Sequence, residues 1–111
     1  MNVSKVFDAL SSDVRRKILA YLSATEMTAG EVAEHFNISK PSLSKHFAIL
    51  ENAGLIQGEK RGQFVHYRLV EENLILTLGS FIQDICPVGR KIKKASKEKA
   101  KLKEMQENAT M

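Results

Sequence analysis

The sequence predicts a mainly α-helical fold with one small β-hairpin, in the order four helices, two strands and a final helix. Two observations support this prediction. Apolar residues recur with the roughly 3.6-residue period of amphipathic helices over most of residues 3–53, and again over residues 71–85. Between these segments the apolar period falls to about 2, which is typical of strands, and a glycine separates the two runs. At 111 residues the chain is long enough for one domain with a modest core.

The first two predicted helices each carry one apolar stripe and are separated by a short polar break. Ser12 in that break is a suitable N-cap for the second helix, and Asp13 follows in its first turn, where the helix dipole favours negative charge. The stripes consist of Val3, Val6, Phe7 and Leu10 in the first helix and Val14, Ile18, Leu19 and Leu22 in the second. Both helices are expected to pack these stripes against a common core.

The third predicted helix begins with strong local signals. Thr28 and Glu31 form a T-x-x-E capping box, and the flanking residues Met27 and Val32 have the spacing of a hydrophobic staple. The apolar face of this helix is predicted to consist of Val32, Ala33 and Phe36. Residues 37–39 are then expected to turn the chain.

The fourth predicted helix has clear start and stop signals. Ser39 is placed to cap it, and Pro41 falls in its first turn, where a missing backbone N–H costs little. Gly54 is a suitable C-terminal stop. The inward stripe is predicted to be Leu43, Phe47 and Leu50. The outer surface of this helix is therefore predicted to show Lys40, Ser42, Ser44, Lys45 and Ile49, with lysines and small hydroxyls in its N-terminal half.

The predicted hairpin has strands over residues 55–60 and 63–69, which flank Arg61 and Gly62. Gly62 readily adopts the positive φ that a tight turn requires. The alternating residues of the second strand that should share one face are Val65, Tyr67 and Leu69.

The last predicted helix runs from about Glu71 to Ile85 and is expected to end at Pro87-Val88-Gly89. Its apolar face consists of Leu74, Leu78, Phe81, Ile82 and Ile85. Ile75 and Leu76 widen this face beyond what a small monomer would cover, which indicates a contact surface for a second chain.

Two short helices joined by a three-residue turn, with a hairpin directly after the second, indicate a winged helix-turn-helix. A helix surface of lysines and small hydroxyls fits the major groove of DNA, which is about 12 Å wide. Basic residues at a hairpin tip are placed to contact phosphates or the minor groove. The predicted DNA-binding residues are Ser39, Lys40, Ser42, Ser44, Lys45 and His46 on the helix and Lys60, Arg61 and Gln63 on the hairpin. Serine hydroxyls both donate and accept, so these residues leave the base sequence open.

Net charge alone does not indicate DNA binding by the folded part. The formal net charge is +4, but residues 90–111 have eight Lys or Arg against three Asp or Glu, a balance of +5, which leaves −1 for residues 1–89. We expect residues 1–89 to form the DNA-binding and dimerisation domain. Residues 90–111 are predicted to form a basic C-terminal tail, either helical or disordered.

Three segments together resemble the ArsR/SmtB family of winged-helix repressors, and within it the SdpR-like autorepressors. They are SSDVRRKIL at residues 11–19, with Val14 where proline is more usual, TAGEVAEHFNISKPSLSKHFAILENAGLI at 28–56, and KRGQFVHYRL at 60–69. The resemblance implies a homodimer whose first and last helices pack across a two-fold axis. It also implies repression by binding an inverted-repeat operator. The predicted interface residues are Val3, Val6, Phe7, Leu74, Leu78, Phe81, Ile82 and Ile85.

The family's usual metal ligands are missing from the sequence, so no metal and no cofactor are predicted. The family's thiolate pair would fall within residues 28–32, where there is no cysteine, and its histidine ligands would fall within residues 71–85, where there is no histidine. The carboxylates of Glu71, Glu72 and Asp84 remain, but oxygen ligands alone seldom hold a transition metal selectively.

Other classes of function find little support. The sequence has no glycine-rich phosphate loop and no plausible nucleophile with its base, so an enzyme is not expected. It also has no run of about 18 apolar residues and no secretory signal, and its single cysteine, Cys86, fits a reducing cytoplasm. Two alternatives stay open: a winged helix that docks on protein without DNA, and a repressor controlled by a small ligand or by modification of Cys86.

Overall fold

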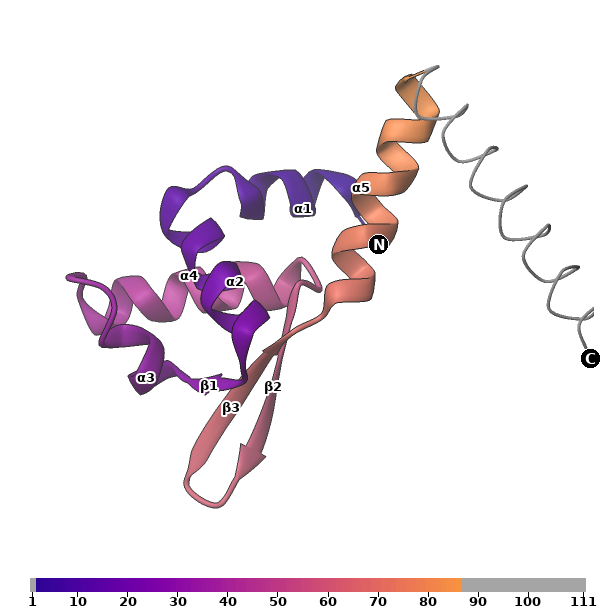
Figure 1. The fold of residues 1–111 in the computed structure, drawn as a ribbon. Coiled ribbons are helices and arrows are strands. Elements are labelled where there is room, and N and C mark those ends of the chain that lie inside the picture. Colours follow the sequence, from indigo (N-terminus) through magenta and orange to yellow (C-terminus); the bar gives the residue numbers. More distant parts are fainter. Residues whose placement is uncertain (1, 87–111) are drawn as a thin grey trace, which may run out of the picture. The chain divides into compact units, whose positions relative to one another are not determined.

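The computed structural model describes residues 2–86, which form five helices and three strands. In chain order these are α1 (Val3–Leu10), α2 (Asp13–Ala24), β1 (Met27–Thr28), α3 (Ala29–Ala33), α4 (Lys40–Asn52), β2 (Ile56–Arg61), β3 (Phe64–Leu69) and α5 (Glu71–Ile85) (Figure 1). The predicted stop at residues 87–89 and the predicted tail at residues 90–111 lie outside the described residues. The chain divides into two compact units, Met1–Thr77 and Leu78–Met111, with the boundary inside α5. The fold described below is that of the first unit.

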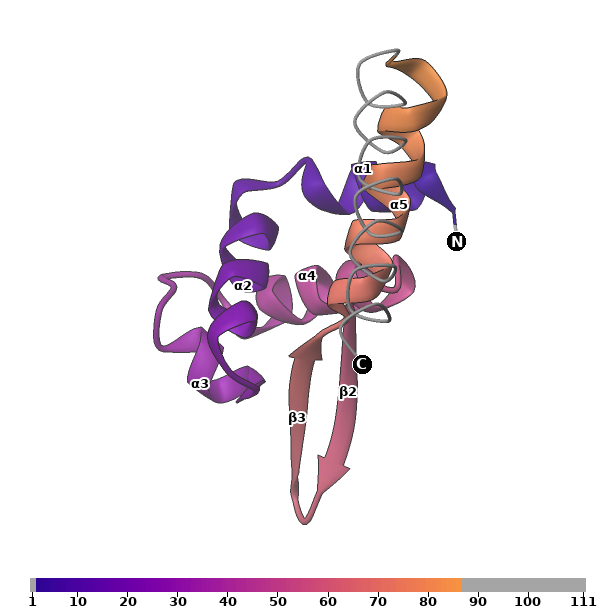
Figure 2. The same ribbon diagram turned by 45° about the vertical axis from the view of Figure 1, so that its right-hand side comes forward.

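The sheet has three strands where the sequence predicted two. All neighbours are antiparallel, in the order β1-β3-β2, and β1 adds Met27 opposite Tyr67 and Thr28 opposite His66. A strand of two residues is too short to show an alternating pattern, and its partner is distant in sequence, so local analysis could not find it. The β2-β3 hairpin projects away from the helices as the wing (Figure 2).

Side-chain caps begin the helices where the sequence predicted them. The Ser12 hydroxyl accepts from the Arg15 amide at 3.3 Å, and that of Ser39 accepts from the Ser42 amide at 3.3 Å. The capping box is complete, because the Glu31 amide donates to the Thr28 hydroxyl and the Thr28 amide donates to the Glu31 carboxylate. These caps fix where α2, α3 and α4 begin.

The core lies between α1, α2, α3, α4 and the start of the wing. Its largest fully buried side chains are Ile18, Leu50, Leu55, Val6 and Val32. The predicted inward stripe of α4 is confirmed, since Leu43, Phe47 and Leu50 are all buried. This burial fixes which side of α4 faces outward.

The third helix is shorter than the sequence predicted. α3 ends at Ala33, although Phe36 still packs against the core. The Tyr21 ring of α2 stacks on His35, with centroids 4.2 Å apart, and meets Phe36 edge-on at 5.8 Å. These aromatic contacts hold the residues after α3 without further helix.

Gly54, the predicted stop of α4, and Gly62, the predicted turn glycine, both have positive φ, 77° and 64° respectively. The wing turn is one residue later than predicted, because Arg61 pairs with Phe64 and leaves Gly62 and Gln63 as the turn residues. A glycine at the first of two turn positions is typical of a type II′ hairpin. Arg61 is therefore the last residue of β2, not part of the turn. Within residues 2–86, no helix is long and apolar enough to cross a membrane.

Candidate nucleic-acid interface

The outward face of α4 presents four polar side chains from its N-terminal half. Lys40, Ser42, Ser44 and Lys45 are exposed, whereas Leu43, Phe47 and Leu50 of the same helix are buried. Ile49, which was also expected on the outer surface, is instead half-buried and packs against the core. Within residues 2–86, Ser44 and Lys45 make no side-chain hydrogen bond or ion pair, so their polar atoms are available to a ligand. The inward packing of α4 thus produces the surface that the sequence predicted.

Ser39 and Ser42 form a pair at the start of α4. Besides capping the helix, the Ser39 hydroxyl donates to the Ser42 hydroxyl at 3.0 Å. Ser39 is thereby held in its capping role, while Ser42 keeps its own hydroxyl proton for another acceptor. Of the two, Ser42 is the better placed to contact DNA.

A hollow of about 270 Å³ lies between α3 and α4, beside this outward face. It is lined by Ala29, Gly30, Ala33, Lys40, Leu43, Ser44 and Phe47. The small side chains of α3 leave space next to Lys40 and Ser44, so a molecule that contacts α4 can approach closely there.

His46 is half-buried and is held by an arginine from another helix. The Arg15 guanidinium, whose residue is 8% exposed, places Nη1 3.2 Å from Nδ1 of His46. It also donates from Nε to the Ala9 carbonyl at 2.7 Å and from Nη2 to the Asp8 carbonyl at 2.9 Å. Burial, followed by the charge of Arg15, lowers the pKa of His46.

Arg61 on the wing is already paired within the chain. Its Nη1 lies 2.9 Å from Oε2 of Glu26, and its Nη2 lies 3.0 Å from Oε2 of Glu59. Hydrogen bonds to Glu59 and then Glu26 raise the pKa of Arg61. The two carboxylates therefore compete with any phosphate for this guanidinium. Lys60 and Gln63 are exposed beside it.

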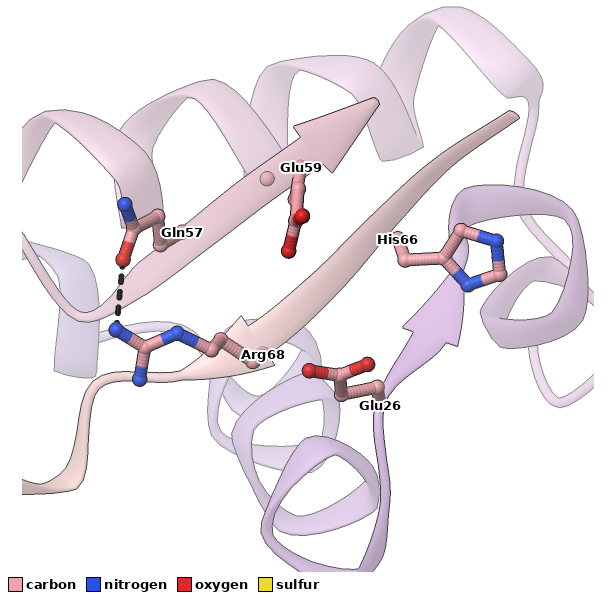
Figure 3. A pocket seen from close by; sticks show the side chains of 6 residues that line it. Glu26, Gln57, Glu59, His66 and Arg68 are labelled. Atoms are coloured by element: carbon pink, nitrogen blue, oxygen red, sulfur yellow. Dashed lines mark hydrogen bonds between the residues drawn. The ribbon is translucent and has the colours of Figure 1, made fainter. Parts of the chain in front are cut away.

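Glu26 and Glu59 both line a polar hollow of about 280 Å³ on the sheet (Figure 3). Its other lining residues are Gln57, Gly58, His66 and Arg68, and Arg68 donates to the Gln57 amide oxygen at 2.7 Å. In the described part of the chain, no three His, Cys, Asp or Glu side chains are grouped to hold a metal ion.

The predicted dimer residues differ in exposure. On α1, Val3 and Phe7 are each 39% exposed, whereas Val6 is fully buried and packs within its own chain. On α5, Leu74 packs against the core and Leu78 and Phe81 are half-buried. The exposed apolar side chains of α5 are Ile75, Leu76, Ile82 and Ile85, with exposed fractions of 64%, 61%, 48% and 62%.

Two residues that shape this surface, Arg15 and Glu26, were not predicted. Arg15 has a signal in the sequence, because Ile18, Leu19 and Leu22 follow it at the spacing of one helix face. An arginine at that position faces the core and needs buried acceptors. Glu26 gives no such signal, since its partner Arg61 is 35 residues away.

Comparison with known proteins agrees with this geometry. Residues 10–59 match a family described as a helix-turn-helix domain. The chain is 52% identical over 67 residues to the transcriptional repressor SdpR of Bacillus subtilis (strain 168), covering 60% of this chain and 74% of SdpR. It is 33% identical over 84 residues to the HTH-type transcriptional regulator YceK of the same organism, covering 74% of this chain and 84% of YceK.

The fold is also similar to a solved structure, an ArsR-like transcriptional regulator from Rhodococcus sp. RHA1. The TM-score is 0.70 at 28% identity, with 88% of this chain and 92% of that chain covered. This similarity confirms the predicted winged helix-turn-helix. The relatives are transcriptional regulators, which confirms the prediction that the chain is not an enzyme. The chain therefore belongs to the ArsR family of helix-turn-helix transcriptional repressors.

Proposed function

We propose that this repressor binds an inverted-repeat operator as a homodimer and does so without a metal ion. The observation that carries the proposal is the outward face of α4, where Ser44 and Lys45 are exposed and make no side-chain hydrogen bond or ion pair within residues 2–86. Such a face can enter the major groove, and the wing then lies against the neighbouring backbone. Ser42, Ser44 and Lys45 would contact base edges, whereas Lys40, Lys60 and Gln63 would contact phosphates.

Exposed apolar side chains support the homodimer. Val3 on α1 is exposed, and on α5 the side chains of Ile75, Leu76, Ile82 and Ile85 are exposed as well. A second copy of the chain covers such surface at a favourable free energy of about 25 cal/mol per Å² of apolar area. Two-fold symmetry in the protein then requires two-fold symmetry in the operator, with half-sites about 34 Å apart.

Residue chemistry supports metal-independent binding. The start of α3 reads Thr28-Ala29-Gly30-Glu31-Val32, without a thiolate, and α5 contains no histidine. We further propose that residues 1–89 suffice for DNA binding and dimerisation, and that residues 90–111 add non-specific attraction to DNA through their charge of +5. The protein would act in the cytoplasm, where its operator is found.

The test is selection from a pooled oligonucleotide library with purified, chelator-treated protein. Enrichment of an inverted repeat with half-sites about ten base pairs apart is the expected result. A requirement for added metal would contradict the metal-independent mechanism, and enrichment of a single half-site would contradict the dimer. If no sequence is enriched with or without metal, the winged helix docks on protein or needs a small ligand.

A further inference from the structure

Arg15 is a buried cation that forms no ion pair within residues 2–86. Its guanidinium instead donates to two backbone carbonyls in the last turn of α1, those of Asp8 and Ala9. Both carbonyls lie at the C-terminus of α1, where a helix offers them no amide of its own. The carbonyl of Asp8 also accepts from the Ser11 amide and hydroxyl. Arg15 therefore joins α1, α2 and α4, since its remaining nitrogen reaches His46.

The chemistry of this contact decides which nitrogen of His46 carries the proton. An arginine guanidinium has five N–H donors and cannot accept a hydrogen bond. Nδ1 of His46, 3.2 Å from Nη1 of Arg15, must therefore be the acceptor and carries no proton. The ring is then neutral with its proton on Nε2. The lowered pKa of His46, caused by burial and by Arg15, agrees with this state.

The other ring nitrogen of His46 is available to a ligand. No buried side-chain nitrogen or oxygen in the described part of the chain lacks a hydrogen-bond partner. Within residues 2–86, Nε2 has no partner of its own, so it must reach solvent. His46 directly follows Lys45, on the edge of α4 that faces α2 rather than on the outward side.

We propose that Arg15 is a positioning residue that fixes His46 in its Nε2–H form, and that this N–H donates to a phosphate oxygen of the operator backbone. The proposal rests on the proposed function, because it requires α4 to lie on DNA. A phosphate fits better than a base, since His46 lies at the edge of α4 and offers one donor to an anionic acceptor. The charge of Arg15 directly behind the ring favours the same anion.

Charged groups around His46 are few. From α2 it faces Arg15, from its own helix Lys45 is adjacent, and from α1 Lys5 and Asp8 line a hollow with Ile49 of α4. Of these, Arg15 contacts the ring directly, and its charge adds to burial in lowering the pKa of His46.

Two amide substitutions, each mimicking one ring nitrogen, separate the two sides of the ring. In His46→Asn the amide oxygen takes the place of Nδ1 and still accepts from Arg15, but the outer donor is lost. In His46→Gln the amide extends to the position of Nε2 and restores that donor. We expect His46→Asn to weaken binding about three- to tenfold, the effect of one lost hydrogen bond, on operator and unrelated duplex alike. His46→Gln should recover part of the loss.

Two outcomes would overturn the phosphate contact. If His46→Asn binds a duplex as tightly as the wild type does, His46 makes no phosphate contact. The proposed function would still stand in that case. A loss confined to the operator would place His46 on a base.

The role of Arg15 is tested on the full chain without DNA. Nitrogen-15 spectra of histidine side chains report which ring nitrogen is protonated, and His35 and His66 serve as internal references. We expect a pure Nε2–H form for His46 in the wild type and a mixture of forms in Arg15→Met. Arg15→Lys, which keeps a charged donor, provides a second variant if Arg15→Met unfolds. A protonated Nδ1 in the wild type, or the same form in wild type and both variants, would overturn the proposal even if the protein binds no DNA.

Discussion

The ring of Tyr67 packs on the ring of Phe47, with centroids 4.6 Å apart and planes inclined by 34°. Tyr67 belongs to β3 of the wing and Phe47 to the buried stripe of α4, so this contact fixes the wing relative to the helix proposed to read DNA. Gly58 on β2 lies next to the ring of Tyr67. A Cβ at Gly58 would be 2.9 Å from Cγ1 of Val65 and 3.0 Å from Cε1 of Tyr67.

Gly58→Ala is therefore expected to lower the free energy of unfolding by about 1–3 kcal/mol, because the added methyl group overpacks this site. Urea unfolding followed by circular dichroism measures the change. Gly30→Ala is the matched control, since a Cβ there meets only the Thr28 hydroxyl at 3.9 Å. Equal stability of Gly58→Ala and wild type would mean that the wing shifts freely to accommodate the methyl group.

In the wild type, Glu26 should weaken DNA binding because its carboxylate competes with phosphate for the guanidinium of Arg61. Glu26→Gln removes one of the two carboxylates that pair with this guanidinium, so we expect up to about a fivefold gain in affinity, the range of an exposed ion pair. Affinity for a non-specific duplex across a salt series provides the measurement, and its slope should steepen. Glu72→Gln in the first turn of α5 is a charge-matched control.

Arg61→Gln removes the guanidinium that both carboxylates bind. It should reduce the salt slope by less than about one unit, since Arg61 is already partly neutralised. In the Arg61→Gln background, Glu26→Gln should lose most of its effect. A full effect there would instead indicate direct repulsion between Glu26 and phosphate.

Ser44 and Lys45 are the residues of α4 expected to contribute most to sequence reading. Replacing either with alanine should weaken operator binding by about 1–3 kcal/mol if it contacts a base. Fluorescence anisotropy on operator and scrambled duplexes distinguishes a base contact, which affects only the operator, from a phosphate contact, which affects both. Unchanged operator affinity in both variants would place the reading surface elsewhere.

The proposed dimer depends on the exposed apolar residues of α5. Ile82→Glu places a charge in that surface, where burial without a partner is costly, and should shift the protein toward monomer. Sedimentation analysis at micromolar concentration provides the measurement. Ile38→Glu, at a residue 37% exposed in the turn before α4, is the control and should leave the oligomeric state unchanged. A monomeric wild type would itself contradict the proposal.

Stability should fall as the solution is acidified, because the pKa of His46 is lowered in the folded state. The unfolded chain, in which a histidine pKa is about 6.5, then binds the proton more readily than the folded chain does. The contribution is present above that value and is lost as the pH falls through the lower folded pKa. Unfolding measured between pH 7 and pH 5 should show a steeper decline for wild type than for His46→Asn. Parallel curves would mean that His46 titrates normally.

Local chemistry explains why most of the fold could be predicted. Ser12, Thr28 and Ser39 cap the helices that follow them, and Gly54 and Gly62 adopt the positive φ expected of them. Each of these signals acts over a few residues. The features that were not predicted depend on pairs far apart in sequence, such as Thr28 with His66 and Glu26 with Arg61.

The candidate site shows the same difference between local signals and contacts of residues far apart in sequence. The polar face of α4 could be predicted, because the buried stripe of one helix determines its opposite side. The pairing of Arg61 and the contact between Arg15 and His46 could not, because each needs the positions of separate elements. Composition indicates which residues are charged, whereas only the fold determines which charges are already neutralised.

Thr28 belongs to two elements at once, since it pairs with His66 in the sheet and its side chain caps α3. α3 begins at the next residue, so no linker residue separates the sheet from the helix-turn-helix. Residues inserted at the Gly62–Gln63 turn would lengthen the wing and leave this junction intact. A single residue inserted after Thr28 would either break the cap or shift the strand register. Wings of altered length should therefore be engineered at the Gly62–Gln63 turn.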